Sequence, residues 1–287
     1  MKLIIILKNK IKTAVLITCH NRLKKTKQCL KALFCQKKTR NVNLEVFLVD
    51  DGSTDGTSKF IKKRYPNINL IKANGDLYWA KSTNLAWRIA IKSKKNFDYF
   101  LLLNNDTYLY EDAFNELFYK NKHMNNIIVG SCCDPITKKR TYGGVKLNRN
   151  LLQPFKFKMT DINGMLQEVH IANGNVLLIS KRIVKRIGIL DGNFEHAFAD
   201  IEYSLKAVEN KIKLFLTRKH VAECVRLKEK KVKHLSISNQ IKNIFHIKKK
   251  PIKSLYRLYS IHGGHIWIIP LIFTYLKSIF YVIYKKQ

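Results

Sequence analysis

Four clusters of acid and amide side chains each follow a short apolar run in the first 110 residues. The clusters are His20-Asn21, Asp50-Asp51-Gly52, Asn74-Gly75-Asp76 and Asn104-Asn105-Asp106. Carboxylates at such places can accept hydrogen bonds from nucleobase N–H groups or ribose hydroxyls, and acids with amide oxygens suit a hard cation such as Mg²⁺ or Mn²⁺. Turns favour Asn, Asp and Gly in any protein, which accounts for one or two clusters but not readily for four.

Two further acids stand near the start of a predicted helix at residues 200–210. Asp200 and Glu202 are two positions apart, so on a helix they point in different directions. One of the two could take a proton from a hydroxyl as a general base, while the other positions a ligand or the helix. The alternative is that both acids only stabilise the positive end of the helix dipole.

The elements that must hold these residues alternate along the first half of the chain. Apolar runs at residues 13–19, 44–50, 68–72 and 99–103 predict strands, and the intervening spacing predicts helices at 23–36, after the DGSTDG turn, and at 82–91 and 113–119. Residues 171–180 predict a loop that enters a further strand. This alternation indicates βαβ units, an α/β class and a mostly parallel sheet. Ligands of such sheets bind beyond the carboxyl ends of the strands, where the four clusters lie.

The composition favours a globular chain with an anionic partner. Of 287 residues, 54 are Lys or Arg and 20 are Asp or Glu, which gives a formal charge of +34, and 46% are hydrophobic, which argues against a disordered basic tail. Nucleic acid, anionic lipid or a phosphorylated small molecule would fit that charge, as would compositional bias alone. No helix-turn-helix, RNP or zinc-finger pattern is visible, so we expect no nucleic-acid partner. The six cysteines lack zinc spacing and predict reduced thiols in the cytoplasm.

The C-terminal part is basic and then apolar. Residues 211–257 hold 15 Lys or Arg against two acids, and residues 266–284 hold 15 hydrophobic side chains in 19. Pro270 and Lys277 interrupt the apolar segment, which favours a helix lying on an anionic membrane surface over a spanning helix or a buried one. Residues 3–7 are too short for the apolar region of a signal peptide, so we expect a cytoplasmic protein, peripheral on the inner face of a membrane.

The ordered strings of the chain resemble a known family. TCHNR (18–22), LVDDGSTDGT (48–57), NGDLYWAKSTNLA (74–86), LLLNNDT (101–107) and FADIEYSLKA (198–207) are together similar to family 2 glycosyltransferases with the GT-A fold, in the rhamnosyltransferase-like branch. The resemblance covers about residues 13–216. It implies a Rossmann-like nucleotide-binding fold at 1–220, with a nucleotide-binding half at 13–110 and an acceptor half at 111–220. Residues 221–287 would form a basic helical extension whose segment 266–284 associates with the membrane.

The resemblance also implies a reaction and a set of site residues. The reaction is inverting transfer of a sugar from a UDP- or dTDP-sugar to a hydroxyl of a glycan or lipid-linked acceptor, in polysaccharide biosynthesis, with Mg²⁺ or Mn²⁺ and Asp200 as the general base. The implied donor residues are Thr18, His20, Asn21, Asp50, Asp51, Asn74, Gly75, Asn84, Asn104 and Asn105. Asp106 would be the metal ligand. Three further candidates are Glu202, which could position a ligand, His196, which could touch the acceptor, and Trp79, which could stack on the sugar or the base.

Three features depart from the pattern of the family. Asn104 replaces the first Asp of the D-x-D motif, and Ala199 replaces an acid before Asp200. The late histidine of the metal site has only the candidates His220 and His234. These departures keep open a degenerate sugar-nucleotide binder without catalysis, and the high charge keeps open a basic nucleic-acid-binding protein.

Overall fold

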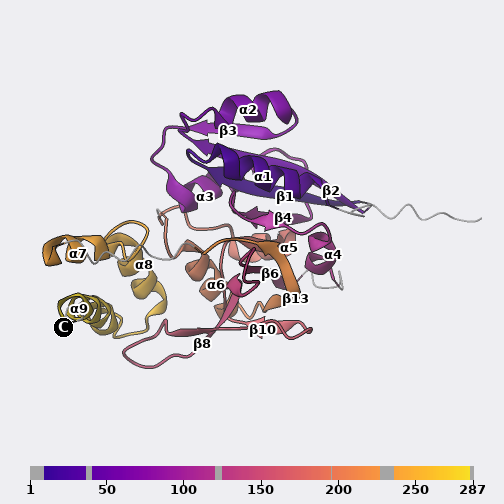
Figure 1. Cartoon of the computed structure of the whole chain (residues 1–287). Coiled ribbons are helices and arrows are strands. Elements are labelled where there is room, and N and C mark those ends of the chain that lie inside the picture. Colours follow the sequence, from indigo (N-terminus) through magenta and orange to yellow (C-terminus); the bar gives the residue numbers. More distant parts are fainter. Residues whose placement is uncertain (1–9, 37–40, 120–124, 195, 227–235, 285–287) are drawn as a thin grey trace, which may run out of the picture.

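A central mixed sheet organises the chain in the computed structural model, which describes all residues except 1–9, 37–40, 120–124, 195, 227–235 and 285–287. Within the described part, the strands follow the order β10-β13-β6-β12-β4-β1-β2-β3, with β5 beside β13 and β7 beside β6. Helices cover both faces of the sheet, and a group of three C-terminal helices lies to one side (Figure 1). The predicted α/β class with a mostly parallel central sheet is confirmed.

The nucleotide-binding half contains the elements that the apolar runs predict. They are β1 (Ile11–Cys19), α1 (Leu23–Phe34), β2 (Val42–Asp51), α2 (Thr57–Arg64), β3 (Asn69–Ala73), α3 (Tyr78–Lys92) and β4 (Tyr99–Leu103). These four strands are parallel, and their register pairs Cys19 with Asp50 and Asp51 with Ala73. The carboxyl ends of β1, β2 and β3 therefore meet at one edge, because parallel strands in register end together.

Side-chain alternation along these strands divides the core into two layers. Ala14 and Leu16 of β1 pack on one face with Trp87 of α3, whereas Val15 and Ile17 pack on the other face with Leu30 of α1. Successive side chains of a strand point to opposite faces, so a continuous apolar run is what a sheet covered on both sides requires.

The second half adds shorter strands that the sequence does not reveal as clearly. Its elements are β5 (Tyr108–Leu109), α4 (Ala113–Leu117), β6 (Ile127–Cys133), β7 (Arg140–Tyr142), β8 (Gly144–Leu147), β9 (Phe157–Met159), β10 (Gln167–Val169), β11 (Ile171–Ala172), β12 (Val176–Ser180), α5 (Lys181–Ile187), α6 (Ala199–Glu209) and β13 (Leu214–Glu223). Strand β12 lies antiparallel between β4 and β6, and β8, β9 and β11 form a small second sheet. Strand β13 runs across the domain boundary that we placed after residue 220.

Three C-terminal helices follow: α7 (Ile237–Ile244), α8 (Ile252–His262) and α9 (Ile268–Tyr284). Helix α8 packs into the main core through Leu255, Leu258 and Tyr259. An ion pair of 2.6 Å joins Arg257 of α8 to Asp191 in the loop before α6. The basic extension is therefore joined to the domain of the central sheet through this helix.

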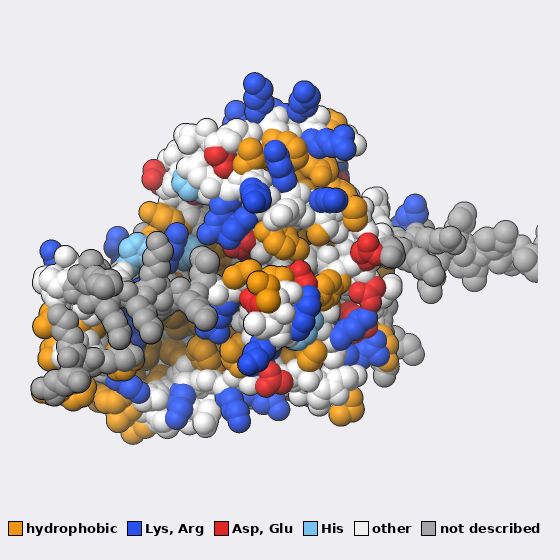
Figure 2. All heavy atoms as spheres, in the orientation of Figure 1, with side chains coloured by type: hydrophobic (Ala, Val, Ile, Leu, Met, Phe, Trp, Pro, Cys, Tyr) orange, Lys and Arg blue, Asp and Glu red, His pale blue; other side chains and the backbone are white. Residues whose placement is uncertain are grey.

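Helix α9 turns much of its apolar surface toward solvent. Ile269, Ile272, Leu276 and Phe280 are all more than half exposed, and their spacing places them along one side of the helix. Figure 2 shows apolar side chains gathered over this part of the molecule, whereas lysine and arginine side chains are spread widely over the visible face. Among the described residues, no helix is both long enough and apolar enough to cross a membrane.

Candidate active site

The loop after β3 is fastened to the end of β2 by Asp51. Its carboxylate is buried and accepts hydrogen bonds from the backbone N–H groups of Gly75 (2.9 Å), Leu77 (3.1 Å) and Tyr78 (2.9 Å). Hydrogen bonds to a charged acceptor are stronger than bonds between neutral groups. The aspartate that the resemblance places at the nucleobase therefore shapes this loop in the structure.

The turn at Gly52 has no room for a side chain. Gly52 adopts a positive φ of 69°, and a Cβ atom there would lie 2.8 Å from the carbonyl carbon of Asn74 and from the nitrogen of Gly75. Asp50 closes the same turn, because its carboxylate accepts from the Ser53 N–H (3.1 Å) and from the Ser58 hydroxyl. The ends of β2 and β3 are thus in direct backbone contact.

The end of β1 adds polar groups to this edge. The Nδ1 atom of His20 contacts the backbone oxygen of Asp51, and Asn21 donates its N–H to the Ser53 hydroxyl at 2.9 Å and accepts from the Thr54 N–H at 2.8 Å. Residues 20 and 21 are exposed, and Thr18 is half-buried on β1 opposite Val49. His20, Asn21, Asp51 and Gly75 are thus brought together, as the strand-end pattern predicts.

Asp106 is held by two cations that the sequence analysis did not select. Arg22, just before α1, and Lys25, within it, lie 2.8 Å and 3.3 Å from the same carboxylate oxygen. The string TCHNR already contains Arg22, and Lys25 follows one helical turn later, so the spacing could have indicated both. These charges stand at the end of β4, where an anionic ligand would be stabilised.

The described residues fit a lightly held divalent cation rather than a closed metal site. No group of three or more His, Cys, Asp or Glu side chains in the described part of the chain could hold a metal. Magnesium is commonly bound by one or two carboxylates together with substrate phosphates, so Asp106 alone fits that mode. His220 instead contacts the Ser131 hydroxyl at 2.9 Å, and His234 lies outside the described residues.

A chain of contacts connects Asp200 to the end of β4. Its carboxylate accepts from the N–H groups of Gly174 (3.1 Å) and Ile201 (3.0 Å). Gly174 packs against the ring of Trp79, where a Cβ atom would lie only 2.3 Å from the indole, and the Trp79 N–H donates to Asn104 at 2.7 Å. The structure therefore brings the predicted base close to the motif that contains Asp106.

Burial raises the pKa of Asp200 above its usual value, although its hydrogen bonds from Gly174 and Ile201 oppose the change. A carboxylate with a raised pKa is a better proton acceptor, because its conjugate acid is weaker. The residue Asp200 is half-buried at the start of α6. This combination is what a general base needs.

His196 stands in a positively charged environment. Its ring lies edge-on to Tyr78, with 6.5 Å between centroids. Burial, followed by the charges of Lys248, Arg22 and His246, lowers its pKa to about 4. His196 is therefore neutral at physiological pH, and the cations around it create a potential that suits an anionic substrate.

Three predicted site residues are not brought into this cluster. Asn84 donates to the Leu190 carbonyl at 2.5 Å and joins α3 to the loop before α6. Asn105 is buried and donates to the Thr26 hydroxyl of α1 at 3.0 Å. Glu202 is buried next to His262 of α8, so its side chain serves helix packing in the structure. Spacing in sequence located these residues near the site but did not give their side-chain directions.

The fold and this polar edge of the sheet define a glycosyltransferase of the GT-A type. Residues 14–188 match the model of the glycosyl transferase family 2, and the chain belongs to that family. The branch within the family stays a prediction. No curated protein matches the chain.

A structural neighbour has the same architecture. The structure titled "Crystal structure of GalNAc-T7 with UDP, GalNAc and Mn2+" aligns with 96% of this chain at a TM-score of 0.60 and 13% sequence identity. At that identity the likeness shows the fold alone. The chain spans 56% of the length of that neighbour.

Proposed function

We propose that the protein is an inverting glycosyltransferase that moves a sugar from a UDP- or dTDP-sugar to a hydroxyl of a glycan or lipid-linked acceptor. One observation carries this proposal: Asp200, whose pKa is raised, is linked through Gly174 and Trp79 to Asn104 at the end of β4. The base and the donor end of the sheet are thus held in one arrangement. Inversion needs a base of this kind on the acceptor side of the sugar.

In the proposed reaction, the acceptor hydroxyl attacks the anomeric carbon as Asp200 takes its proton. The bond between that carbon and the diphosphate oxygen breaks, and the diphosphate leaves with the bonding electrons. His20, Asn21 and the loop held by Asp51 are proposed to line the nucleoside pocket, with Thr18 and Asn74 beside them. Because hydrogen bonds to the Asp51 carboxylate already hold that loop, donor binding would lose little conformational entropy in ordering it.

The reaction must also stabilise the negative charge that develops on the leaving diphosphate. Arg22 and Lys25 stand at the end of β4, and His246 and Lys248 raise the potential around His196. In this proposal Asp106 would hold a Mg²⁺ or Mn²⁺ ion together with the donor phosphates, and the ion would stabilise the negative charge of the leaving group. The neighbour solved with UDP and Mn²⁺ supports this choice by likeness of fold.

Asp200→Asn tests the proposal. With a panel of UDP- and dTDP-sugars, we expect release of the nucleoside diphosphate to fall by about 10²–10⁴-fold. Binding of the donor should persist, because an amide oxygen can still accept from Gly174. Asp161→Asn, a change at an exposed acid, is the control and should be as active as the unaltered protein. Turnover of Asp200→Asn at the control rate would contradict the assignment.

The exposed face of α9 supports a further part of the proposal. Its apolar stripe and the exposed Lys277 of the same helix suit the inner, anionic surface of a membrane. Apolar burial and attraction to anionic lipids act together in such helices. We therefore place α9 on a membrane surface, with the active site facing an acceptor held there.

A further inference from the structure

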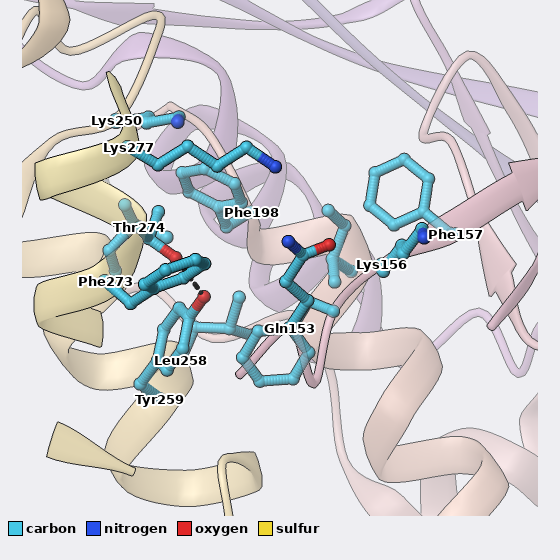
Figure 3. Close-up of a pocket in the computed structure, with 13 residues that line it drawn as sticks. Gln153, Lys156, Phe157, Phe198, Lys250, Leu258, Tyr259, Phe273, Thr274 and Lys277 are labelled. Atoms are coloured by element: carbon cyan, nitrogen blue, oxygen red, sulfur yellow. Dashed lines mark hydrogen bonds between the residues drawn. The ribbon is translucent and has the colours of Figure 1, made fainter. Parts of the chain in front are cut away.

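A cavity lies between the transferase fold and the C-terminal helices. It measures about 330 Å³ and is lined by side chains of α6, α8, α9 and the segment before β9. Most of the lining is aromatic or aliphatic, with Phe155, Phe198, Leu258, Tyr259 and Phe273 around it (Figure 3). Binding sites for small molecules are typically apolar hollows of this size that contain a few placed polar groups.

Three lysines supply the charged groups of this cavity. Figure 3 shows Lys250 and Lys277 extended beside each other on one side, with Lys156 on the opposite side. Burial and the charge of Lys277 lower the pKa of Lys250. Among the described residues, no carboxylate forms an ion pair with any of the three lysines. The Lys250 ammonium donates to the Ser278 hydroxyl, and an anion beside Lys250 and Lys277 would offset the repulsion between their charges.

The cavity lies next to the predicted base along the chain. Phe198 and Ile201, which line it, flank Asp200 on either side in the sequence. From the other direction, His246 and Lys248 lower the pKa of His196, and Lys250 follows them at the cavity. The cavity therefore borders the start of α6, the helix that carries Asp200.

We propose that this cavity binds the lipid part of the acceptor, with a hydrocarbon chain among the aromatic side chains and a phosphate at Lys250 and Lys277. The inference rests on the proposed function, and it names the acceptor as a membrane amphiphile that carries a phosphate. Helix α9 supplies one wall of the cavity through Phe273 and Lys277 and exposes Ile272 and Leu276 to solvent. The same helix thus borders both the cavity and the surface that we place on the membrane.

Farnesyl phosphate, farnesol and inorganic phosphate are the probes that separate chain from charge. Titration calorimetry with the full chain, below the micelle concentration, should show farnesyl phosphate binding about tenfold or more tightly than farnesol. Inorganic phosphate should show no binding in the same range. Equal affinity for farnesyl phosphate and farnesol, no binding of either, or equal binding of inorganic phosphate would each overturn the proposal.

The variant Lys277→Glu tests where the phosphate group binds. This change should weaken farnesyl phosphate by about tenfold or more and leave farnesol binding unchanged, which shows that the cavity is still formed. Lys253→Glu, at an exposed position of α8 outside the cavity, is the matched control and should alter neither affinity. Farnesyl phosphate affinity that Lys277→Glu does not change would contradict the assignment.

Asp200→Asn separates this inference from the proposed function. The variant should bind farnesyl phosphate as tightly as the unaltered protein, because Asp200 does not line the cavity. Transfer without farnesyl phosphate binding would remove the inference alone. Binding without any transfer by the unaltered protein would leave the cavity in place and remove the proposed reaction.

Discussion

The polar edge of the sheet and the C-terminal helices differ in whether their side chains have partners within the chain. At the sheet edge, the carboxylates of Asp50 and Asp51 are bound by N–H groups or hydroxyls of neighbouring loops. In the C-terminal helices, apolar side chains face solvent, and Lys250 and Lys277 have no carboxylate partner among the described residues. The comparison indicates that bonds within the chain hold the sheet edge in shape, whereas under our proposals a bound lipid and a membrane would cover the C-terminal helices.

The largest stability effect should come from breaking the first arrangement with Asp51→Asn. The amide would place an N–H donor opposite the N–H groups of Tyr78, Leu77 or Gly75, which now donate to the carboxylate. We expect a loss of about 3 kcal/mol of unfolding free energy, because buried donors lose their acceptor. Chemical denaturation measures the loss.

Asp98→Asn is the control for that change. Asp98 accepts one backbone N–H, from Lys12 at 2.8 Å, so we expect a loss of only about 1 kcal/mol. Equal losses in the two variants would show that the three bonds of Asp51 do not act as a unit.

Gly52→Ala should produce the next largest effect. The added methyl group would meet the backbone of residues 74 and 75 at 2.8 Å, and the positive φ adds strain. We expect a loss of about 2 kcal/mol and weaker donor binding. Gly164→Ala isolates the contact, because Gly164 has a similar φ of 82° but open space around it. If the two variants lose the same stability, the contact between the β2 and β3 ends is not tight.

His262→Gln should remove a pH-dependent attachment of α8. Nδ1 of His262 lies 2.7 Å from Glu209, and Glu202 is 3.7 Å from Nε2. Burial alone would lower the pKa of His262, but the hydrogen bonds and charges of Glu202 and Glu209 outweigh it and raise the pKa. The contribution to stability is therefore complete below the unfolded pKa, near ~6.5, and is lost as the pH rises through the raised folded value.

Unfolding of the unaltered protein and of His262→Gln across this pH range measures that contribution. The stability difference between the two should shrink as the pH rises. His265→Gln, at an exposed position after α8, should keep the pH dependence of the unaltered protein. A stability difference that grows with pH would reverse the sign of the assigned interaction.

The smallest stability effect should come from Leu276→Glu on the exposed face of α9. Since Leu276 is 59% exposed, we expect a change within about 0.5 kcal/mol, yet binding to anionic vesicles should weaken clearly. Ile136→Glu, at an apolar residue that is 89% exposed on a distant loop, should leave vesicle binding almost unchanged. Equal vesicle binding by the two variants would leave α9 without a membrane role.

The strands of the nucleotide-binding half could be predicted because each is a continuous apolar run. Residues 99–103 match β4 fully, and the runs at 13–19 and 44–50 fall short of β1 and β2 by only a few residues. Strand β13 was missed because Arg218, Lys219 and His220 interrupt its apolar pattern. The predicted helical extension contains α8, but the bounds of this helix were not predicted because it lies within the most basic stretch, although its core residues Leu255 and Leu258 have helical spacing.

The sequence indicates where the site residues lie but not which way their side chains point. Strand ends located His20, Asp51 and Asp106 at one edge, because parallel strands end together. Whether a neighbouring side chain points into the site depends on packing: Asn104 reaches Trp79, while Asn105 turns to Thr26. The pairing of Arg22 and Lys25 with Asp106 also depends on tertiary structure, because the start of α1 and the end of β4 are far apart in the sequence.

The contact between Trp79 and Gly174 sets a limit on how the two positions can vary. A methyl group at 174 would overlap the indole ring, so a larger residue there requires a smaller one at 79. The loss of the indole would in turn release Asn104, which now accepts its N–H. Related sequences should therefore exchange volume between these two positions, and the identity of residue 104 should change along with them.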